Sequence, residues 1–135
     1  MTFRSTEFEV VTGDRPTVVD VTSRVAAVLE PGDEGLVNVF APHATCGLAI
    51  LETGAGSDPD LLSAVEDLLP ADDRWQHRHG SPGHGRDHVL PAWIAPSIVV
   101  PVIGGTLSLG TWQSIVLVDT NVDNRVRRVR VSVLV

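Results

Sequence analysis

Hydrophobic and polar residues alternate along two long segments of the chain, which predicts an amphipathic β-strand at each end. In the segment 3–11, Phe8 and Val10 alternate with Glu7 and Glu9. In the segment 126–135, the valines at 129, 131, 133 and 135 share one face. A period of two places successive side chains on opposite faces of a sheet. Shorter apolar runs between turn residues predict further strands, at 35–40, 47–51, 98–102, 106–109 and 112–119.

Two other segments carry apolar residues at helical spacing. Asp20 is a suitable N-cap for a helix with Val21, Val25, Val28 and Leu29 on one face, ending before residue 31. A second helix is predicted to begin at the Asp-Pro pair 58–59 and to continue until residue 70, and a short third one covers 87–94. The order of elements predicts one α+β domain over residues 1–135, with a largely antiparallel sheet packed with two main helices.

The segment between the second helix and the later strands is polar and has no periodicity. Residues 71–86 are rich in glycine, proline and histidine, and a loop of this length is often functional. His77 and His79 project to one side if the backbone is extended, and His84 and His88 align if it is helical. Either pair offers neutral imidazoles to zinc or a similar divalent ion, whereas a solvated linker is the alternative reading.

Composition narrows the available chemistry. The ten cationic side chains of the 135 residues are all arginine, so the chain has no lysine and Schiff-base chemistry is excluded. It also has no tyrosine, so no tyrosine can act as an acid or base. The net charge of −7 disfavours nucleic-acid binding, although four arginines within 125–130 leave room for a local anion site. The single cysteine fits a reducing compartment, and no membrane span or signal segment is recognisable. These observations predict a soluble cytoplasmic protein.

Several isolated residues are candidates for a site at strand ends. His43 follows Pro42 where a strand ends, and it either caps that strand or acts in a site. Glu52 lies at the end of an apolar strand. It is either a solvated carboxylate, or a general base or metal ligand that faces the histidines. The glycine-rich turn 54–56 precedes a helix and could offer backbone N–H groups to a phosphate. The indication of a phosphate site is weak, because the chain has no lysine to complete a P-loop.

Three further residues have both a structural and a chemical interpretation. Cys46 lies three residues after a histidine, but a small buried core residue is the better interpretation than a nucleophile. Gln113 and Asp119 fall on the same face of the predicted strand 112–119 by alternation. A glutamine in an apolar strand needs hydrogen-bond partners if it is buried, and an edge position is the alternative.

Taken in order, these motifs resemble the YjbQ-like family of small proteins over nearly the whole chain. The first part is Pro42-His43-Ala44-Thr45-Cys46-Gly47-Leu48-Ala49-Ile50, then Glu52 and Asp58-Pro59. The later part is His77, His88, the strand 98–102, Leu109-Gly110-Thr111-Trp112-Gln113 and Arg127-Arg128. The piece Leu-Gly-Thr-Trp-Gln is the most specific. Leu51 and Thr53 stand where the family has asparagines, and the usual Glu-Gly-Asn of the histidine loop reads Gly-Ser-Pro here.

The resemblance implies an α+β homotrimer and, in some members, a weak thiamine-phosphate synthase activity. That reaction joins a pyrimidine pyrophosphate to a thiazole phosphate. The resemblance also carries forward a set of candidate site residues, namely His43, Glu52, His77, His88, Gln113 and Asp119, although the family usually has glutamate in place of Asp119.

The leading hypothesis is therefore a small enzyme that acts on a phosphorylated ligand with a divalent metal, zinc for example. In it His43, His77 and His88 bind the metal, while Thr45, Arg127 and Arg128 bind the phosphate. Glu52 orients a ligand or moves a proton. His79 and His84 are expected to be secondary. The alternative is a non-catalytic trimeric module that binds a metal or a metabolite.

Overall fold

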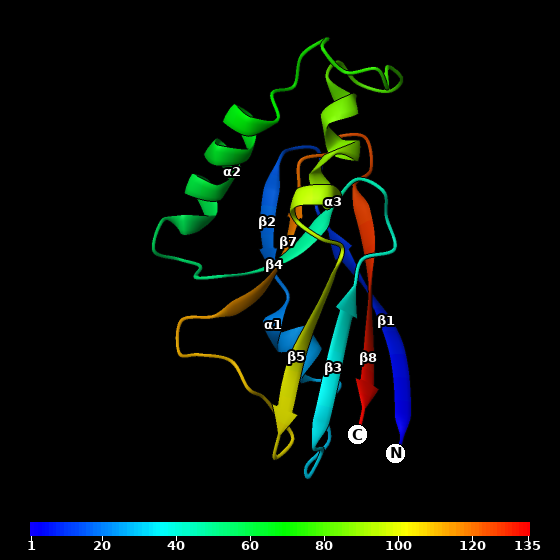
Figure 1. Cartoon of the computed structure of the whole chain (residues 1–135), viewed down its shortest axis with the longest axis vertical. Coiled ribbons are helices and arrows are strands. Elements are labelled where there is room, and N and C mark those ends of the chain that lie inside the picture. The colour runs from blue at the N-terminus through cyan, green and yellow to red at the C-terminus, as the bar shows by residue number, and fades with distance from the viewer.

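The strands form two antiparallel sheets in a computed structural model that describes residues 1–135 (Figure 1). The larger sheet has the order β1 (Phe3–Val11), β8 (Val126–Leu134), β3 (Gly35–Phe40), β5 (Ser97–Ile103) and β6 (Thr106–Leu107). The smaller sheet has the order β2 (Thr17–Asp20), β7 (Ser114–Asp119) and β4 (Gly47–Leu51). The predicted α+β class with antiparallel pairing is confirmed, and the strands divide between two sheets.

The main core lies between the two sheets. Alternate residues of β8, such as Val129 and Val131, are buried, whereas the intervening Arg128 and Arg130 are exposed. The smaller sheet contributes the buried Ile115 from β7, among others, to the same cluster of fifteen buried residues. Burying each such aliphatic side chain contributes about 1.5–3 kcal/mol. The valine alternation therefore sets which face of the larger sheet is inward.

The helices begin close to the predicted positions but are shorter. The N-cap of α1 (Thr22–Ala26) is Val21 and not the predicted Asp20, which lies one residue earlier and accepts a hydrogen bond from the N–H of Thr22 at 2.9 Å. The longest helix, α2 (Ser57–Leu68), begins one residue before Asp58, and its N-cap is Gly56 with φ of 107°. Glycine adopts this left-handed conformation without strain, so Asp58 is in the first turn and is not the N-cap.

Two strand predictions differ from the structure. The short strand β2 was not expected, because its four residues are too few to show a periodicity. The strand β7 begins at Ser114, so Gln113 lies in the preceding turn, where its side-chain oxygen accepts a hydrogen bond from the N–H of Gly110 at 2.7 Å. The prediction that Gln113 and Asp119 share a strand face is therefore wrong.

A second, smaller cluster fastens the histidine-rich segment to α2. Val65 and Leu69 pack with Leu90, the first residue of α3 (Leu90–Trp93), which follows the 3-10 helix η1 (His84–His88). The buried Arg86 of η1 donates to the carbonyl of Leu69 at 3.1 Å and forms an ion pair with Glu66. None of the helices has the length and apolar character needed to cross a bilayer.

Candidate functional site

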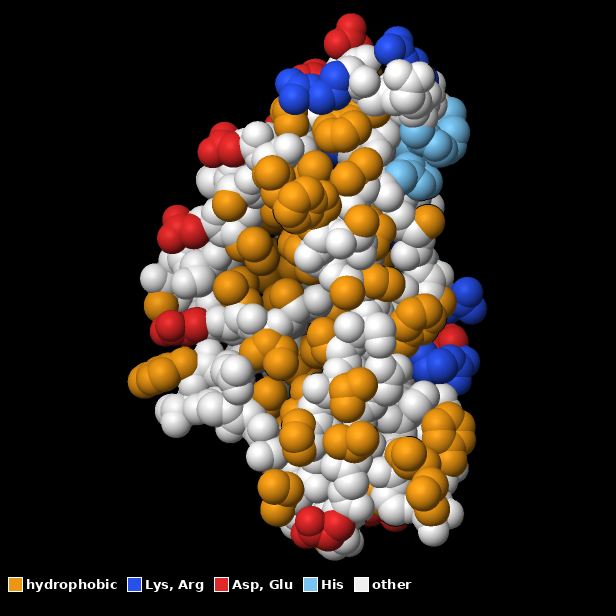
Figure 2. Space-filling view, viewed as in Figure 1, with side chains coloured by type: hydrophobic (Ala, Val, Ile, Leu, Met, Phe, Trp, Pro, Cys, Tyr) orange, Lys and Arg blue, Asp and Glu red, His pale blue; other side chains and the backbone are white.

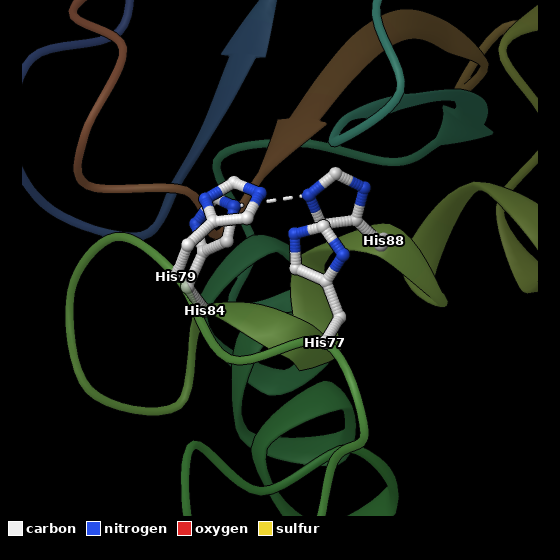
Figure 3. A group of neighbouring side chains, drawn as sticks. All are labelled: His77, His79, His84 and His88. Atoms are coloured by element: carbon white, nitrogen blue, oxygen red, sulfur yellow. Dashed lines mark hydrogen bonds between the residues drawn. The ribbon is translucent and has the colours of Figure 1, made fainter.

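Four histidine side chains converge at one end of the molecule. His77 and His79 come from the loop after α2, and His84 and His88 come from η1; each offers a ring nitrogen, and these atoms lie within 4.8 Å of one another (Figure 3). In Figure 2 the histidines gather into one patch at the upper end of the protein surface. Both spacings that suggested ligand pairs in the sequence therefore contribute to a single cluster.

Glycines allow the loop to lie directly against η1. A Cβ on Gly85 would overlap both the Trp75 side chain and the backbone carbonyl oxygen of His77. A Cβ on Gly83, whose φ is 78°, would collide with the backbone of Ala71. These close approaches bring the first histidine pair next to the second.

Contacts with His88, Asp123 and Asn121 orient the ring of His84. Its Nε2 lies 3.0 Å from Nε2 of His88, while its Nδ1 lies 3.0 Å from a carboxylate oxygen of Asp123. The amide nitrogen of Asn121 is 3.1 Å from the same Nδ1 and donates to Asp87 at 3.3 Å. A carboxylate on Nδ1 that turns Nε2 toward a common point is the arrangement usual for metal-binding histidines.

One ring nitrogen of the cluster has no partner in the protein. Nε2 of His77 is buried and makes no hydrogen bond, and an unpaired buried polar atom normally has a functional or solvent-related explanation. Burial, followed by the charges of neighbouring histidines, lowers the pKa of both His77 and His88 below the usual value. The rings are therefore biased toward the neutral form, which is the form that binds metals.

The donor set fits a divalent transition metal such as zinc. A tetrahedral ion with nitrogen ligands at about 2.0–2.1 Å separates its ligand atoms by about 3.3 Å. The His84–His88 nitrogen separation of 3.0 Å is close to this spacing. The other nitrogens of the cluster are up to 4.8 Å apart, so the four imidazoles could hold such an ion once the more distant rings move closer.

A pocket of about 440 Å³ adjoins the cluster. His79, His84 and His88 form one wall, and His43 and Arg127 lie among the other residues that line it. His43 follows β3 and accepts a hydrogen bond at Nε2 from the N–H of Arg128 at 2.9 Å. His43 therefore lines the pocket but does not belong to the group of four converging histidines, so the expected ligand set of His43, His77 and His88 does not assemble as such.

Arg127 is held rigidly in this pocket by a buried ion pair. Its Nε donates to Asp119 at 2.6 Å and its Nη2 donates to the other carboxylate oxygen at 3.1 Å. Nη2 also donates to the hydroxyl of Thr45 at 2.8 Å. The side chains of Arg127 and Asp119 are only 3% and 0% exposed, so the pair is removed from competing water. Asp119 and Thr45 thus position the arginine.

Other candidates lie outside this arrangement. Glu52 is exposed on the connection between β4 and α2, and neither it nor Gln113 lines the pocket. In Figure 1 that connection is at the opposite end of α2 from the histidine loop. Arg128 is exposed and lies 3.9 Å from Glu7, on the outer face of the larger sheet. The structure therefore brings together only part of the expected set.

Two residues that support the cluster were not expected from the sequence. Asp123 and Asn121 lie in the turn after β7, more than thirty positions from the histidines they contact. Only their position directly after an apolar strand could have indicated them, because strand ends often carry functional side chains.

Cys46 is packed in the core, in agreement with the preferred interpretation. It is fully buried, and burial raises the pKa of its thiol to about 12. A thiol in this state is neither a nucleophile nor a metal ligand at neutral pH.

Two antiparallel sheets with a histidine cluster carried by a loop and a 3-10 helix define a small α+β protein with a candidate metal centre. The family model described as "UPF0047 protein YjbQ-like" matches residues 6–135, and the chain belongs to this family.

Known relatives agree with this assignment. The UPF0047 protein Rv2556c of Mycobacterium tuberculosis is 61% identical over 118 residues, covering 87% of this chain and 89% of that protein. The crystal structure of hypothetical protein APE1520 from Aeropyrum pernix has a TM-score of 0.88 at 32% identity, covering 97% of this chain and 98% of the other. Conserved hypothetical protein TT1486 from Thermus thermophilus has a TM-score of 0.83 at 32% identity, over 96% and 99% of the two chains.

Proposed function

We propose that this protein is a metal-dependent enzyme that acts on a phosphorylated small molecule. The observation that carries the proposal is the convergence of four histidines, with the buried Nε2 of His77 left without a partner in the protein. No group of the protein bonds to that nitrogen, and a divalent ion bound at its lone pair would give it a partner.

Each part of the pocket has a role in this proposal. His77, His79, His84 and His88 hold the metal, and Asp123 fixes the ring of one of them. The bound ion would neutralise negative charge on a phosphate or pyrophosphate group. Arg127, which lines the same pocket and is held in place by its buried ion pair, binds the ligand's phosphate.

The resemblance to the YjbQ-like family suggests a particular reaction, the joining of a pyrimidine pyrophosphate to a thiazole phosphate with release of pyrophosphate. We propose this thiamine-phosphate synthase-like transfer as the activity to test first. We also propose that the protein is cytoplasmic, because the lone thiol fits a reducing compartment. From the family resemblance we propose that it is a homotrimer. An apolar hollow of about 230 Å³ between α2 and α3, visible in Figure 2, supports association with other copies.

A non-catalytic metal- or metabolite-binding module is the second candidate. Two side chains that the resemblance marks as catalytic, Glu52 and Gln113, do not line the pocket of the single chain. With these groups absent, the remaining pocket contains binding groups but no free carboxylate base in the expected position. The absence of these two side chains from the pocket is the observation that supports the second candidate, binding without turnover.

Elemental analysis of the purified protein tests the proposal, with sedimentation mass measured on the same sample. We expect one transition-metal ion per chain in the wild type, and none in the double variant His77→Ala/His88→Ala. Gln76→Ala is the matched control, because this residue is exposed in the same loop and should retain the metal. Unchanged stoichiometry in the double variant would refute the ligand assignment.

Turnover separates the two candidate functions. Release of pyrophosphate from the two phosphorylated substrates, measured with metal-loaded protein, should occur in the wild type and disappear in His77→Ala/His88→Ala. Stoichiometric metal with no detectable pyrophosphate release would support the binding module instead.

A further inference from the structure

His43 lines the same pocket as three histidines of the cluster, and its ring is hydrogen-bonded to the backbone of Arg128. We propose that His43 is a neutral hydrogen-bond donor through Nδ1, which together with Arg127 forms a subsite for a tetrahedral oxyanion such as phosphate. This role differs from that of a metal ligand. It deepens the proposed function, because the subsite would place the anionic end of a ligand beside the metal centre.

The tautomer of His43 follows from its contact with Arg128. The backbone N–H of Arg128 points at Nε2 of the ring at 2.9 Å. A backbone amide can only donate, so Nε2 must present its lone pair. The carbonyl oxygen of Arg128 is farther away, at 3.2 Å, and an acceptor cannot bond to a lone pair. The single hydrogen of the neutral ring therefore sits on Nδ1, where no protein group accepts it.

This tautomer argues against a metal-ligand role. A neutral imidazole has one nitrogen with a lone pair available for bonding, and in His43 the Arg128 amide already occupies that nitrogen. Binding a metal through Nδ1 would require loss of the second ring hydrogen. The four histidines of the cluster have no such backbone bond to a ring nitrogen among their hydrogen bonds.

Arg127 provides the second half of the subsite. Its Nε and Nη2 are taken by Asp119 and Thr45, while Nη1 makes no hydrogen bond within the protein. Both Arg127 and His43 line the same pocket. The bidentate pair with Asp119 fixes the guanidinium plane, so the free donor has a defined direction before a ligand arrives.

The charge balance of the pocket indicates how the anion would bind. Asp119 offsets the charge of Arg127, and the carboxylate of Asp123, which lines the same pocket, is engaged with His84 and with Ser81. The subsite therefore attracts an oxyanion mainly through directed hydrogen bonds. A cation at the neighbouring histidines would strengthen binding, so metal and anion are expected to bind cooperatively.

The first test reads the tautomer directly. Long-range proton–nitrogen NMR of protein labelled at histidine nitrogens should show the hydrogen of His43 on Nδ1 at neutral pH, assigned by comparison with His43→Gln. A hydrogen on Nε2 would overturn the proposal.

The second test measures inorganic phosphate binding by calorimetry, with metal-loaded, dialysed protein and with metal-free protein. His43→Ala should weaken phosphate binding at least about tenfold, since a hydrogen bond to a charged group is lost, yet keep the wild-type metal content. His43→Gln, which retains a donor, should fall between the two. Arg130→Ala is the matched control, because it removes an exposed charge of β8 that is paired with Glu7 and does not line the pocket, so binding should be unchanged.

Each adverse outcome has a distinct meaning. Loss of metal from His43→Ala, equal weakening in Arg130→Ala, or no phosphate binding by the wild type overturns the subsite. If the wild type takes up no metal, the proposed function fails, whereas the tautomer and phosphate binding to the metal-free protein still decide the role of His43.

Discussion

The buried ion pair between Asp119 and Arg127 provides a quantitative test of the structure. Asp119→Ala removes both hydrogen bonds to the guanidinium, at 2.6 and 3.1 Å, and leaves a positive charge in a side chain that is 3% exposed. It also removes the acceptor for the N–H of Asn121. Leaving one partner of a buried pair uncompensated costs about 3–5 kcal/mol.

A second ion pair in the chain offers a control with nearly the same geometry on the surface. Asp72 accepts hydrogen bonds from Nε and Nη2 of Arg74, at distances from 2.7 to 3.0 Å, but the two side chains are 40% and 58% exposed. Water replaces such contacts when they are lost, so Asp72→Ala should cost no more than about 1 kcal/mol. The difference between the two variants isolates the effect of burial.

Urea unfolding at one fixed protein concentration measures both variants, because assembly would make stability depend on concentration. We expect Asp119→Ala to lower the midpoint by more than about 1 M, and Asp72→Ala by a small fraction of that. Asp119→Leu combined with Arg127→Met should recover part of the loss, since no unpaired charge remains. Equal costs for the two single variants would show that burial does not determine what the loss of the ion pair costs.

Three further predictions concern the core and the histidine loop. Iodoacetamide should leave Cys46 unmodified in the native protein, because burial raises the pKa of its thiol to about 12, and should modify it fully after denaturation; rapid native labelling would contradict this. Burial and neighbouring histidines lower the folded pKa of His77 and His88. The contribution of these two neutral rings to the stability of the metal-free protein should therefore be fully present above the unfolded value of 6.5 and be lost as pH falls through the lower folded values. Equal urea midpoints at about pH 8 and about pH 5.5 would disprove that dependence. Gly85→Ala should cost about 1–3 kcal/mol, because the added Cβ overlaps the carbonyl of His77, and should reduce metal uptake, whereas Gln76→Ala should change neither the urea midpoint nor the metal content.

The parts of the fold that depend on local repetition could be predicted from the sequence. The β8 valines alternate over nine residues, so the inward face is readable without knowledge of its partners. The four residues of β2 carry no comparable pattern, and the turn at Gln113 has residues that also suit a strand. Short elements are determined by their sheet partners, which a local pattern does not reveal.

The candidate site was predictable in composition but not in arrangement. Four histidines within a short loop indicated a metal centre, yet the family resemblance selected His77 and His88 with the more distant His43. The structure instead brings His79 and His84 into the cluster, because glycines allow the loop to lie against η1. Contacts of this kind depend on the three-dimensional path of an aperiodic loop, for which spacing carries little information.

The position of the last strand determines when the larger sheet can form during synthesis. The strand β8 pairs with both β1 and β3, in a register that joins Phe3 to Leu134 and Val37 to Val133. The strand β1 pairs with β8 alone, so it has no neighbour in the sheet until β8 has been synthesised. An unpaired strand edge is exposed to other chains for that whole interval. Glu7 and Glu9 place negative charge along the unpaired edge of β1, and this charge opposes premature pairing between nascent chains.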